Sequence, residues 1–255
     1  MTFPLKAWLE ENDRLLRLRL DRPKANIVDA AMIGALDDAL SAHADDASLR
    51  AVLLDASGPH FSFGASVEEH LPDRCAEMLA SLHALLKKMV AYPVPILVAV
   101  RGQCLGGGLE VAMSGHLIFA GQDAMLGQPE IKIGVFAPAA SCLMPERIGR
   151  SQAEDLLFSG RPINAEEARR IGLANAVSDD PEGAAVTYFQ EHLAGLSAVA
   201  VRHAVAASRR MMAARVADDL DRVERQYLDE LMKTDDAVEG LSAFIEKRRA
   251  NWKDR

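Results

Sequence analysis

The sequence predicts an α/β fold from three observations. Up to about residue 180, short strand-like runs alternate with amphipathic segments of helical period. An apolar run at 94–100 leads directly into a glycine turn and then a helix, the local pattern of a buried strand followed by a site-forming turn. From residue 181 onward only helical patterns remain. We therefore expect a strand-containing core at 1–180 that carries the functional site, and a helical region at 181–255.

Composition indicates a globular chain without a nucleic-acid or membrane partner. Hydrophobic residues make up 49% of the 255 residues, which is enough to bury a sizeable core. The net charge of -8 and the pI of about 5.4 disfavour binding to a phosphate backbone, because that partner usually requires clustered basic residues. A membrane span needs an apolar stretch of about 18 residues, and no stretch of this sequence is that long. The N-terminus lacks a signal-peptide pattern. We therefore expect a cytoplasmic protein.

The three cysteines do not form a recognisable ligand or disulfide pattern. Cys75, Cys104 and Cys142 are widely spaced and include no CxxC pair. An odd number without such a pair disfavours both a disulfide framework and a zinc site. We expect three buried free thiols and no bound metal.

The first 72 residues predict two strands, one helix and a loop. Residues 14–20 alternate arginine with leucine, which is the period of a half-exposed strand. Residues 29–44 have apolar side chains at helical spacing, and Asp29 is a suitable N-cap. Residues 49–58 predict a more buried strand that ends in a turn. The segment 60–72 fits neither pattern, and we interpret it as a functional loop that opens into a short helix near Ser66.

The middle of the chain alternates helices with strands. Residues 75–93 form a long amphipathic pattern that is stopped by prolines, and the strand at 94–100 follows it. A further strand is expected at 116–121. Later elements are predicted at these positions: two short helices on either side of Gly149, a capped helix at 164–172 and a last strand at 173–177.

The helical region after residue 180 contains four amphipathic stretches and no strand pattern. Such helices must bury their apolar faces against something else. We expect them to cover a neighbouring subunit or to fold back over the functional site. The alternative is that they only complete the core of their own chain.

The segment 101–134 contains the strongest indication of chemistry. Backbone N–H groups at the turn Gly106-Gly107-Gly108 have no partner inside the helix that follows, so they can bind negative charge. Glu110 lies one turn into that helix, and Glu130 follows a second glycine turn at Gly127. Two carboxyl groups beside an anion-stabilising turn predict acid/base chemistry on an oxyanion.

Four motifs in order resemble the crotonase superfamily of enoyl-CoA hydratases and isomerases. They are RPKAN at 22–26, HFSFGAS at 60–66, the segment 101–134, and the segment 147–177. The resemblance covers nearly the whole chain. It implies a spiral of ββα units followed by a C-terminal helical region for oligomerisation, with a homotrimer or a dimer of trimers as the expected assembly.

The resemblance also implies the site and its substrate class, an acyl-CoA thioester. It assigns the oxyanion hole to the backbone N–H groups of Ala65 and Gly107, and the binding and activation of water to Glu110 and Glu130. By the same analogy, Glu110 acts as the base and Glu130 as the proton donor. The presence of both carboxyl groups favours hydration over isomerisation. No cofactor is expected, because the coenzyme A belongs to the substrate.

Contacts to the coenzyme A are expected from the RPKAN motif. The resemblance places Lys24 and Ala25 there, with Lys24 either approaching the nucleotide phosphates or remaining solvated. The histidines His60, His70 and His83 are given no catalytic role. His83 lies in a helical pattern and is expected to be a packing or surface residue.

Two departures from the family pattern bear on the substrate. Ser66 stands where many members have aspartate, which should affect the loop more than the chemistry. The segment VFAPAAS at 135–141 replaces a glycine-rich loop, and its Phe136 and Pro138 predict a firm apolar wall beside the acyl group. A firm wall suits a compact ring better than a flexible chain.

The combined pattern resembles hydratases that act on a cyclic dienoyl-CoA thioester. The expected reaction converts cyclohexa-1,5-diene-1-carbonyl-CoA to 6-hydroxycyclohex-1-ene-1-carbonyl-CoA in anaerobic aromatic (benzoyl-CoA) degradation. Within the superfamily, a hydratase of straight-chain 2-enoyl-CoA or of cyclohex-1-ene-1-carbonyl-CoA is the alternative. From a different class, the alternative is a noncatalytic relative that binds acyl-CoA or RNA.

Overall fold

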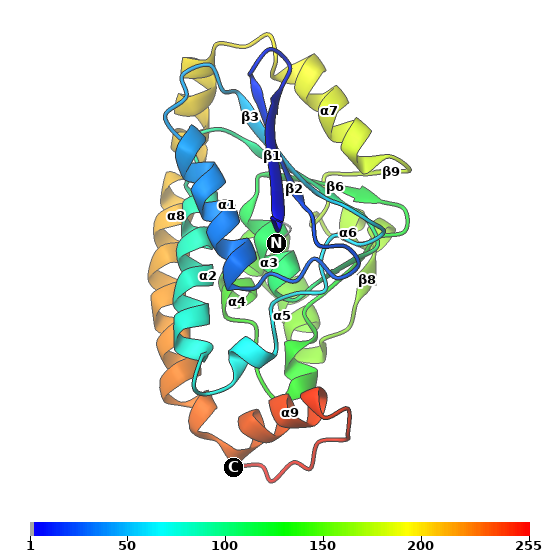
Figure 1. Ribbon diagram of the computed structural model, residues 1–255, viewed down its shortest axis with the longest axis vertical. Helices are drawn as coiled ribbons and strands as arrows, with labels where there is room; N and C mark the ends of the chain where they lie inside the picture. Colours follow the sequence, from blue (N-terminus) through cyan, green and yellow to red (C-terminus); the bar gives the residue numbers. More distant parts are fainter. Residues whose placement is uncertain (1–2) are drawn as a thin grey trace.

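A computed structural model describes residues 3–255, and its centre is a six-stranded sheet (Figure 1). β1 runs antiparallel to β2, and every other neighbouring pair is parallel, as expected when helices connect the strands. In spatial order the strands are β1 (Leu5–Glu10), β2 (Leu15–Leu20), β3 (Ala51–Ala56), β4 (Ile96–Val100), β6 (Leu117–Gly121) and β9 (Ala176–Ser178). The strands predicted from periodicity are confirmed, whereas β1 was not predicted.

A small second sheet lies beside the glycine turn. It consists of β5 (Gln103–Leu105), β7 (Met125–Gly127) and β8 (Ile163–Asn164). None of the three was predicted, because strands of two or three residues contain too few alternations to stand out from a loop. This sheet positions the chain on both sides of the turn: Gly106 N donates to Gly127 O at 2.9 Å.

Most helices of the core begin and end where the sequence predicts. Asp29 caps the first helix by accepting from Met32 N at 3.0 Å, and Asn164 caps another by accepting from Glu167 N at 2.9 Å. The helices of this part are α1 (Ala30–His43), α2 (Cys75–Val90), α3 (Gly107–Ser114), α4 (Pro138–Ile148), α5 (Arg150–Ser159) and α6 (Ala165–Arg170), with short 3-10 turns η1 (Glu68–His70) and η2 (Pro129–Ile133). The three cysteines are buried free thiols, as expected.

The predicted helical region divides into two parts with different packing. α7 (Pro181–His192) packs on the main sheet, where Ala185 and Phe189 join Leu53 and Phe119 in a separate small core. α7 therefore belongs to the same core as the strands that were predicted within residues 1–180. The remaining elements are α8 (Ala198–Asp229), η3 (Leu231–Lys233) and α9 (Asp235–Ile245).

α8 is one continuous helix of 32 residues that runs beside α2 along the long axis of the molecule (Figure 1). The sequence suggested two separate stretches here, but no glycine or proline interrupts them. α8 also packs on α4, and α9 returns to η1 and η2. These helices thus fold back over the core of their own chain. Within residues 3–255, none of the helices combines the length and the apolarity required to cross a membrane.

Candidate active site

The turn between β5 and α3 requires glycine at its first position. Gly106 is the N-cap of α3 with φ +49° and ψ -130°, a conformation that residues with a side chain rarely adopt. A Cβ at Gly106 would also overlap Oε1 of Glu130. The absence of a side chain therefore lets the carboxyl group of Glu130 approach the turn closely.

The loop at 60–66 brings Ala65 to the same turn. Phe63 N donates to Ala25 O at 2.9 Å, and Val28 N donates to Gly64 O at 3.0 Å, so the RPKAN segment supports this loop from behind. Ala65 N lies 3.0 Å from the point where Gly107 would carry a Cβ. Among residues 3–255, no carbonyl or side chain accepts a hydrogen bond from either Ala65 N or Gly107 N. Two adjacent free N–H groups can bind a developing oxyanion.

The opposite end of α3 is neutralised by two arginines. Arg147 donates to Met113 O at 2.7 Å, and Arg209 donates to Ser114 O at 3.3 Å and to Gly115 O at 2.6 Å. Burial, followed by the charge of Arg209, lowers the pKa of Arg147 to about 9. The carbonyl end of the helix thus carries positive partners, while its N–H end stays free for a negative ligand.

Glu110 is buried inside α3 and is held by the N-terminus of α4. The residue is only 4% exposed, and its Oε1 accepts from Ala140 N at 2.8 Å. Pro138 occupies the first turn of α4, where a backbone N–H would have no partner inside the helix, so proline loses no hydrogen bond there. Burial raises the pKa of Glu110 above its ordinary value, and hydrogen bonds from Ala140 and Ala139 together with the charge of His83 offset only part of that rise. The amides of α4 therefore favour the ionised form of this carboxyl group.

Glu130 lies in η2, where it faces the glycine turn and a neutral amide. The amide nitrogen of Gln128, oriented by the hydrogen-bond network, donates to the two carboxyl oxygens at 3.1 and 3.2 Å. Burial, followed by the charge of Glu110, raises the pKa of Glu130 to about 8. Both carboxyl groups therefore hold their protons to a higher pH than ordinary glutamates, and they interact closely enough that the charge of one affects the other.

Ala65, Gly106 and Glu130 line a cavity of about 360 Å³, whereas Gly107 and Glu110 are not among its lining residues. α9 reaches it because Gly240 packs directly on η2, where a Cβ would overlap Ile133 O. The lining residues are Phe63, Gly64, Ala65, Val67, Gly106, Pro129, Glu130, Lys132, Ile133 and Phe244. The wall is therefore mainly apolar, with Glu130 and the free amide of Ala65 on it.

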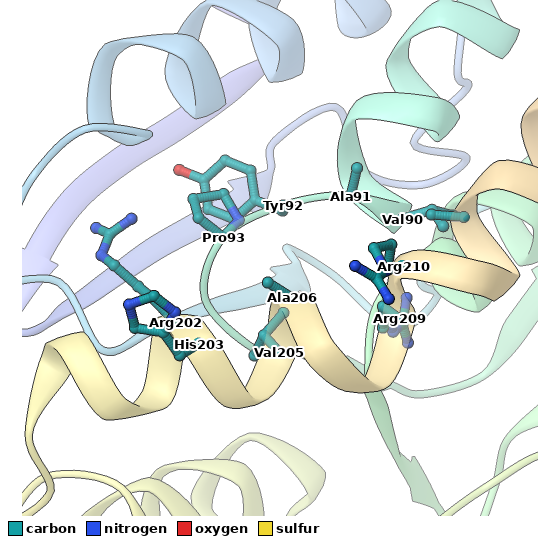
Figure 2. Close-up of a pocket in the computed structure, with 11 residues that line it drawn as sticks. Val90, Ala91, Tyr92, Pro93, Arg202, His203, Val205, Ala206, Arg209 and Arg210 are labelled. Atoms are coloured by element: carbon teal, nitrogen blue, oxygen red, sulfur yellow. The ribbon is translucent and has the colours of Figure 1, made fainter.

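A larger pocket of about 500 Å³ lies elsewhere, between the end of α2 and α8 (Figure 2). Its walls carry Arg202, Arg209 and Arg210 and include no carboxyl group. Neither Ala65 nor Gly107 lines this pocket. The smaller cavity is therefore the candidate active site.

Comparison with known proteins agrees with this geometry. The family model described as enoyl-CoA hydratase/isomerase matches residues 10–255. The chain belongs to this family. Among its relatives, a cyclohexa-1,5-dienecarbonyl-CoA hydratase from Thauera aromatica is 63% identical over 252 residues, covering 99% of this chain and 98% of the relative. A probable enoyl-CoA hydratase from Bacillus subtilis is 30% identical and covers 92% and 94% of the two chains.

Solved structures show the same fold. An enoyl-CoA hydratase from Mycobacterium avium subsp. paratuberculosis has a TM-score of 0.86 at 26% identity, with 98% of this chain and 99% of that chain covered. An enoyl-CoA hydratase/isomerase from Pseudoalteromonas atlantica has a TM-score of 0.85 at 29% identity, with the same coverage. The resemblance to the crotonase superfamily and the expected fold class are thereby confirmed.

The structure brings Ala65, Gly107, Glu110 and Glu130 together, whereas the other predicted family residues lie around them. Pro138 is buried at the start of α4, and Phe136 is half-buried against Tyr227, with ring centroids 5.4 Å apart. Neither lines the cavity, so their contact with a ring substrate stays a prediction.

The two expected coenzyme A contacts differ in exposure. The Lys24 side chain is exposed, and Ala25 supports the loop at 60–66 through its carbonyl group. Their contact with coenzyme A also stays a prediction.

Three residues in or around this candidate site were not predicted. Gln128 binds Glu130, and its place two residues before that glutamate was the available signal. Phe244 reaches the cavity from α9. His83 is fully buried and places Nδ1 2.6 Å from Glu224 of α8, a partner that sequence order does not reveal. Across residues 3–255, no group of three or more His, Cys, Asp or Glu side chains is arranged to hold a metal ion.

Proposed function

We propose that this chain is a hydro-lyase that hydrates cyclohexa-1,5-diene-1-carbonyl-CoA to 6-hydroxycyclohex-1-ene-1-carbonyl-CoA during anaerobic aromatic degradation. The observation that carries the proposal is the 63% identity, over almost the full length of both chains, with the cyclohexa-1,5-dienecarbonyl-CoA hydratase from Thauera aromatica. This relative supports the activity expected from the sequence. The local geometry supports the same chemistry, because it combines an oxyanion-binding turn with an acid and a base.

The oxyanion hole has the first role in the mechanism. The thioester oxygen accepts hydrogen bonds from the N–H groups of Ala65 and Gly107, which have no other acceptor among the described residues. These donors stabilise the negative charge that moves onto the oxygen when the β carbon is attacked. Each such donor contributes roughly 3 kcal/mol in comparable oxyanion holes.

The two carboxyl groups move the protons. Ionised Glu110 takes one proton from water as the water oxygen bonds to the β carbon, and the electron pair spreads into a dienolate. Protonated Glu130 then gives its proton to the far end of the conjugated system, so the remaining double bond shifts and the net result is a 1,4 addition of water. The mainly apolar lining of the cavity limits the access of bulk water to the reacting groups.

The decisive experiment is steady-state hydration, followed by chromatography of the CoA esters, with the cyclic diene beside crotonyl-CoA. A strong preference for the diene is expected. Preference for crotonyl-CoA would identify a straight-chain enoyl-CoA hydratase, and absence of turnover with both would favour the noncatalytic relative.

We also propose a homotrimer or a dimer of trimers that works in the cytoplasm without a cofactor other than the coenzyme A of its substrate. Three free thiols suit a reducing compartment. Light scattering should give three or six times the chain mass of 27.7 kDa, and a monomer would contradict the proposed assembly. Dialysis against a chelator should leave turnover unchanged; a loss restored by a metal would contradict the proposed absence of a cofactor.

A further inference from the structure

The pocket between the end of α2 and α8 gathers positive charge without a negative partner (Figure 2). Arg202, Arg209 and Arg210 line it, and within residues 3–255 none of the three forms an ion pair with a carboxylate. Burial lowers the pKa of Arg209 to about 10, as expected for a cation that no close anion stabilises. By contrast, Arg215 of the same helix, outside the pocket, donates to both carboxyl oxygens of Glu146 at 3.0 and 2.9 Å. In a chain of net charge -8, this local excess of positive charge calls for an explanation.

Helix ends compensate only part of this excess. Arg209 donates to carbonyl groups at the end of α3, and Arg202 donates to Ala44 O at the end of α1 at 2.9 Å. The carbonyl end of a helix carries about half a negative charge, so the two ends offer about one negative charge to three arginines. Buried Arg147 also shares the end of α3. Arg210 makes no hydrogen bond to any of the residues that the structure describes.

His116 shows the same lack of acceptors beside Arg209. It follows Gly115, whose carbonyl group accepts from Arg209 at 2.6 Å. Its Nδ1 accepts from Ile96 N at 3.0 Å, which assigns the hydrogen of the neutral ring to Nε2. That nitrogen is buried and has no hydrogen-bond partner in the described part of the chain. Burial, followed by the charges of Arg209 and Arg147, lowers the pKa of His116 to about 2, so the ring stays neutral.

The rest of the pocket is apolar and large enough for a small organic molecule. Its volume of about 500 Å³ lies within the usual range of ligand pockets, about 300 to 1,000 Å³. Asp45 and Asp46 are close enough for their charges to affect Tyr92, but neither lines the pocket, and the carboxyl group of Asp46 accepts from Ser48 N at 2.9 Å. Besides the arginines, the lining residues are Val90, Ala91, Tyr92, Pro93, His203, Val205, Ala206 and Ala213.

We propose that this pocket binds a small organic carboxylate, with its charged group at Arg209 and Arg210 and its apolar body against Val205 and Ala206. Figure 2 shows the two arginines together at one end of the pocket, with Val205 and Ala206 between them and Arg202. Arginine binds a carboxylate through paired, charge-assisted hydrogen bonds. The apolar wall selects an anion that also carries an apolar group. The site lies outside the candidate active site, so this inference does not depend on the proposed function.

Calorimetric titration of the full chain with benzoate is the test. Benzamide is the uncharged control of the same shape, and inorganic phosphate is an anion without an apolar body. We expect benzoate to bind with a Kd of about 1 mM or tighter. Benzamide and phosphate should each bind about 10-fold more weakly or less.

Three variants locate the bound molecule. Arg210→Gln removes a cation that has no hydrogen bond to lose within residues 3–255, and it should weaken benzoate binding about 5- to 20-fold. Ala206→Trp should fill the apolar part of the pocket and abolish binding. Arg225→Gln, at an exposed position of α8 outside the pocket, is the matched control and should bind benzoate like the unmodified chain. Circular dichroism checks that each variant is folded.

The other outcomes would each overturn the proposal. Equal affinity for benzamide, or an unchanged affinity of Arg210→Gln, would exclude recognition of the carboxylate, and equal affinity for phosphate would exclude recognition of the apolar body. Benzoate that still binds to Ala206→Trp but is displaced by a CoA ester would lie in the candidate active site instead. Absence of benzoate binding, together with a lower mass of Ala206→Trp in light scattering, would show that a second copy of the chain covers the pocket.

Discussion

Glu110 and Glu130 are the same residue type in the same site, and burial raises the pKa of both, yet their hydrogen-bond partners differ. Glu110 is held by amides at the N-terminus of α4 and lies near His83. Glu130 instead faces a neutral amide and the charge of the other carboxyl group. Burial raises the pKa of both groups, so it cannot distinguish them. The comparison teaches that backbone N–H donors of α4, which hold Glu110 and not Glu130, are the feature that distinguishes two equally buried carboxyl groups.

The largest expected effect follows from removing the acid. Glu130→Gln cannot supply the proton to carbon, so we expect kcat to fall by about 100- to 10,000-fold while binding of the CoA ester stays nearly intact. Stopped assays and calorimetric titration measure the two quantities. Glu77→Gln, a change at an exposed residue of α2, serves as the control for loss of one negative charge. Full activity of Glu130→Gln would reject Glu130 as the proton donor.

A large effect on turnover is also expected from a substitution at Gly106, where the glycine turn contacts the carboxyl group of Glu130. Gly106→Ala introduces a Cβ against Glu130 at a backbone conformation with φ +49°, so turnover should fall by about 100-fold. The matched variant is Gly149→Ala, at φ +76° with no atom within 4 Å of the new Cβ. It should cost about 1 to 3 kcal/mol of unfolding free energy, because φ +76° with ψ 158° is a conformation essentially limited to glycine, without affecting turnover. Equal turnover of the two variants would contradict the close fit between Gly106 and Glu130.

The pH profile should show a decrease of about tenfold per unit on its alkaline side. Because the pKa of Glu130 is raised to about 8, this group holds its proton below that pH and loses it above. We expect kcat/KM to fall as the pH rises through about 8, with the value belonging to the coupled pair of carboxyl groups. Circular dichroism at each pH checks that the chain stays folded. A profile that is flat to pH 10 would assign the proton to another group.

The smallest expected effect on turnover is that of His83→Gln, which acts through the pKa of Glu110. The charge of His83 lowers the pKa of Glu110, so His83→Gln should raise that pKa and move the acidic side of the profile to higher pH. Turnover at low pH should fall a few-fold, about 3- to 10-fold, with little change at the optimum. His192→Gln, at an exposed position of α7, is the control. A uniform decrease at every pH would indicate that His83 has only a packing role.

The sequence predicts the parts of this fold that repeat a local pattern. Asp29 predicts the start of α1, and the alternation of Arg and Leu predicts β2. Both can be recognised because each pattern is contained in a short stretch of consecutive residues. The second sheet escapes prediction because its strands are too short to have a period. The continuity of α8 is decided by packing on α2 and α4, which periodicity alone does not reveal.

Some features of the candidate site can likewise be predicted from the sequence, and others cannot. The glycine turn with Glu110 and Glu130 can be recognised from the sequence, and the family resemblance adds Ala65 and Gly107. What distinguishes the two carboxyl groups could not be predicted, because it depends on contacts between segments far apart. The pair formed by His83 and Glu224, for example, joins residues 141 positions apart. Such distances are set only when the helices pack.

The cavity is lined by Phe63 from an early loop and by Phe244 from the last helix. Protein synthesis proceeds from the N-terminus, so the glycine turn and both carboxyl groups leave the ribosome well before α9 does. A nascent chain can therefore carry all of its acid/base groups and still lack one wall of the chamber that contains them. Enclosure of the substrate, and with it the exclusion of bulk water, becomes possible only after α9 has been synthesised and has packed on η2.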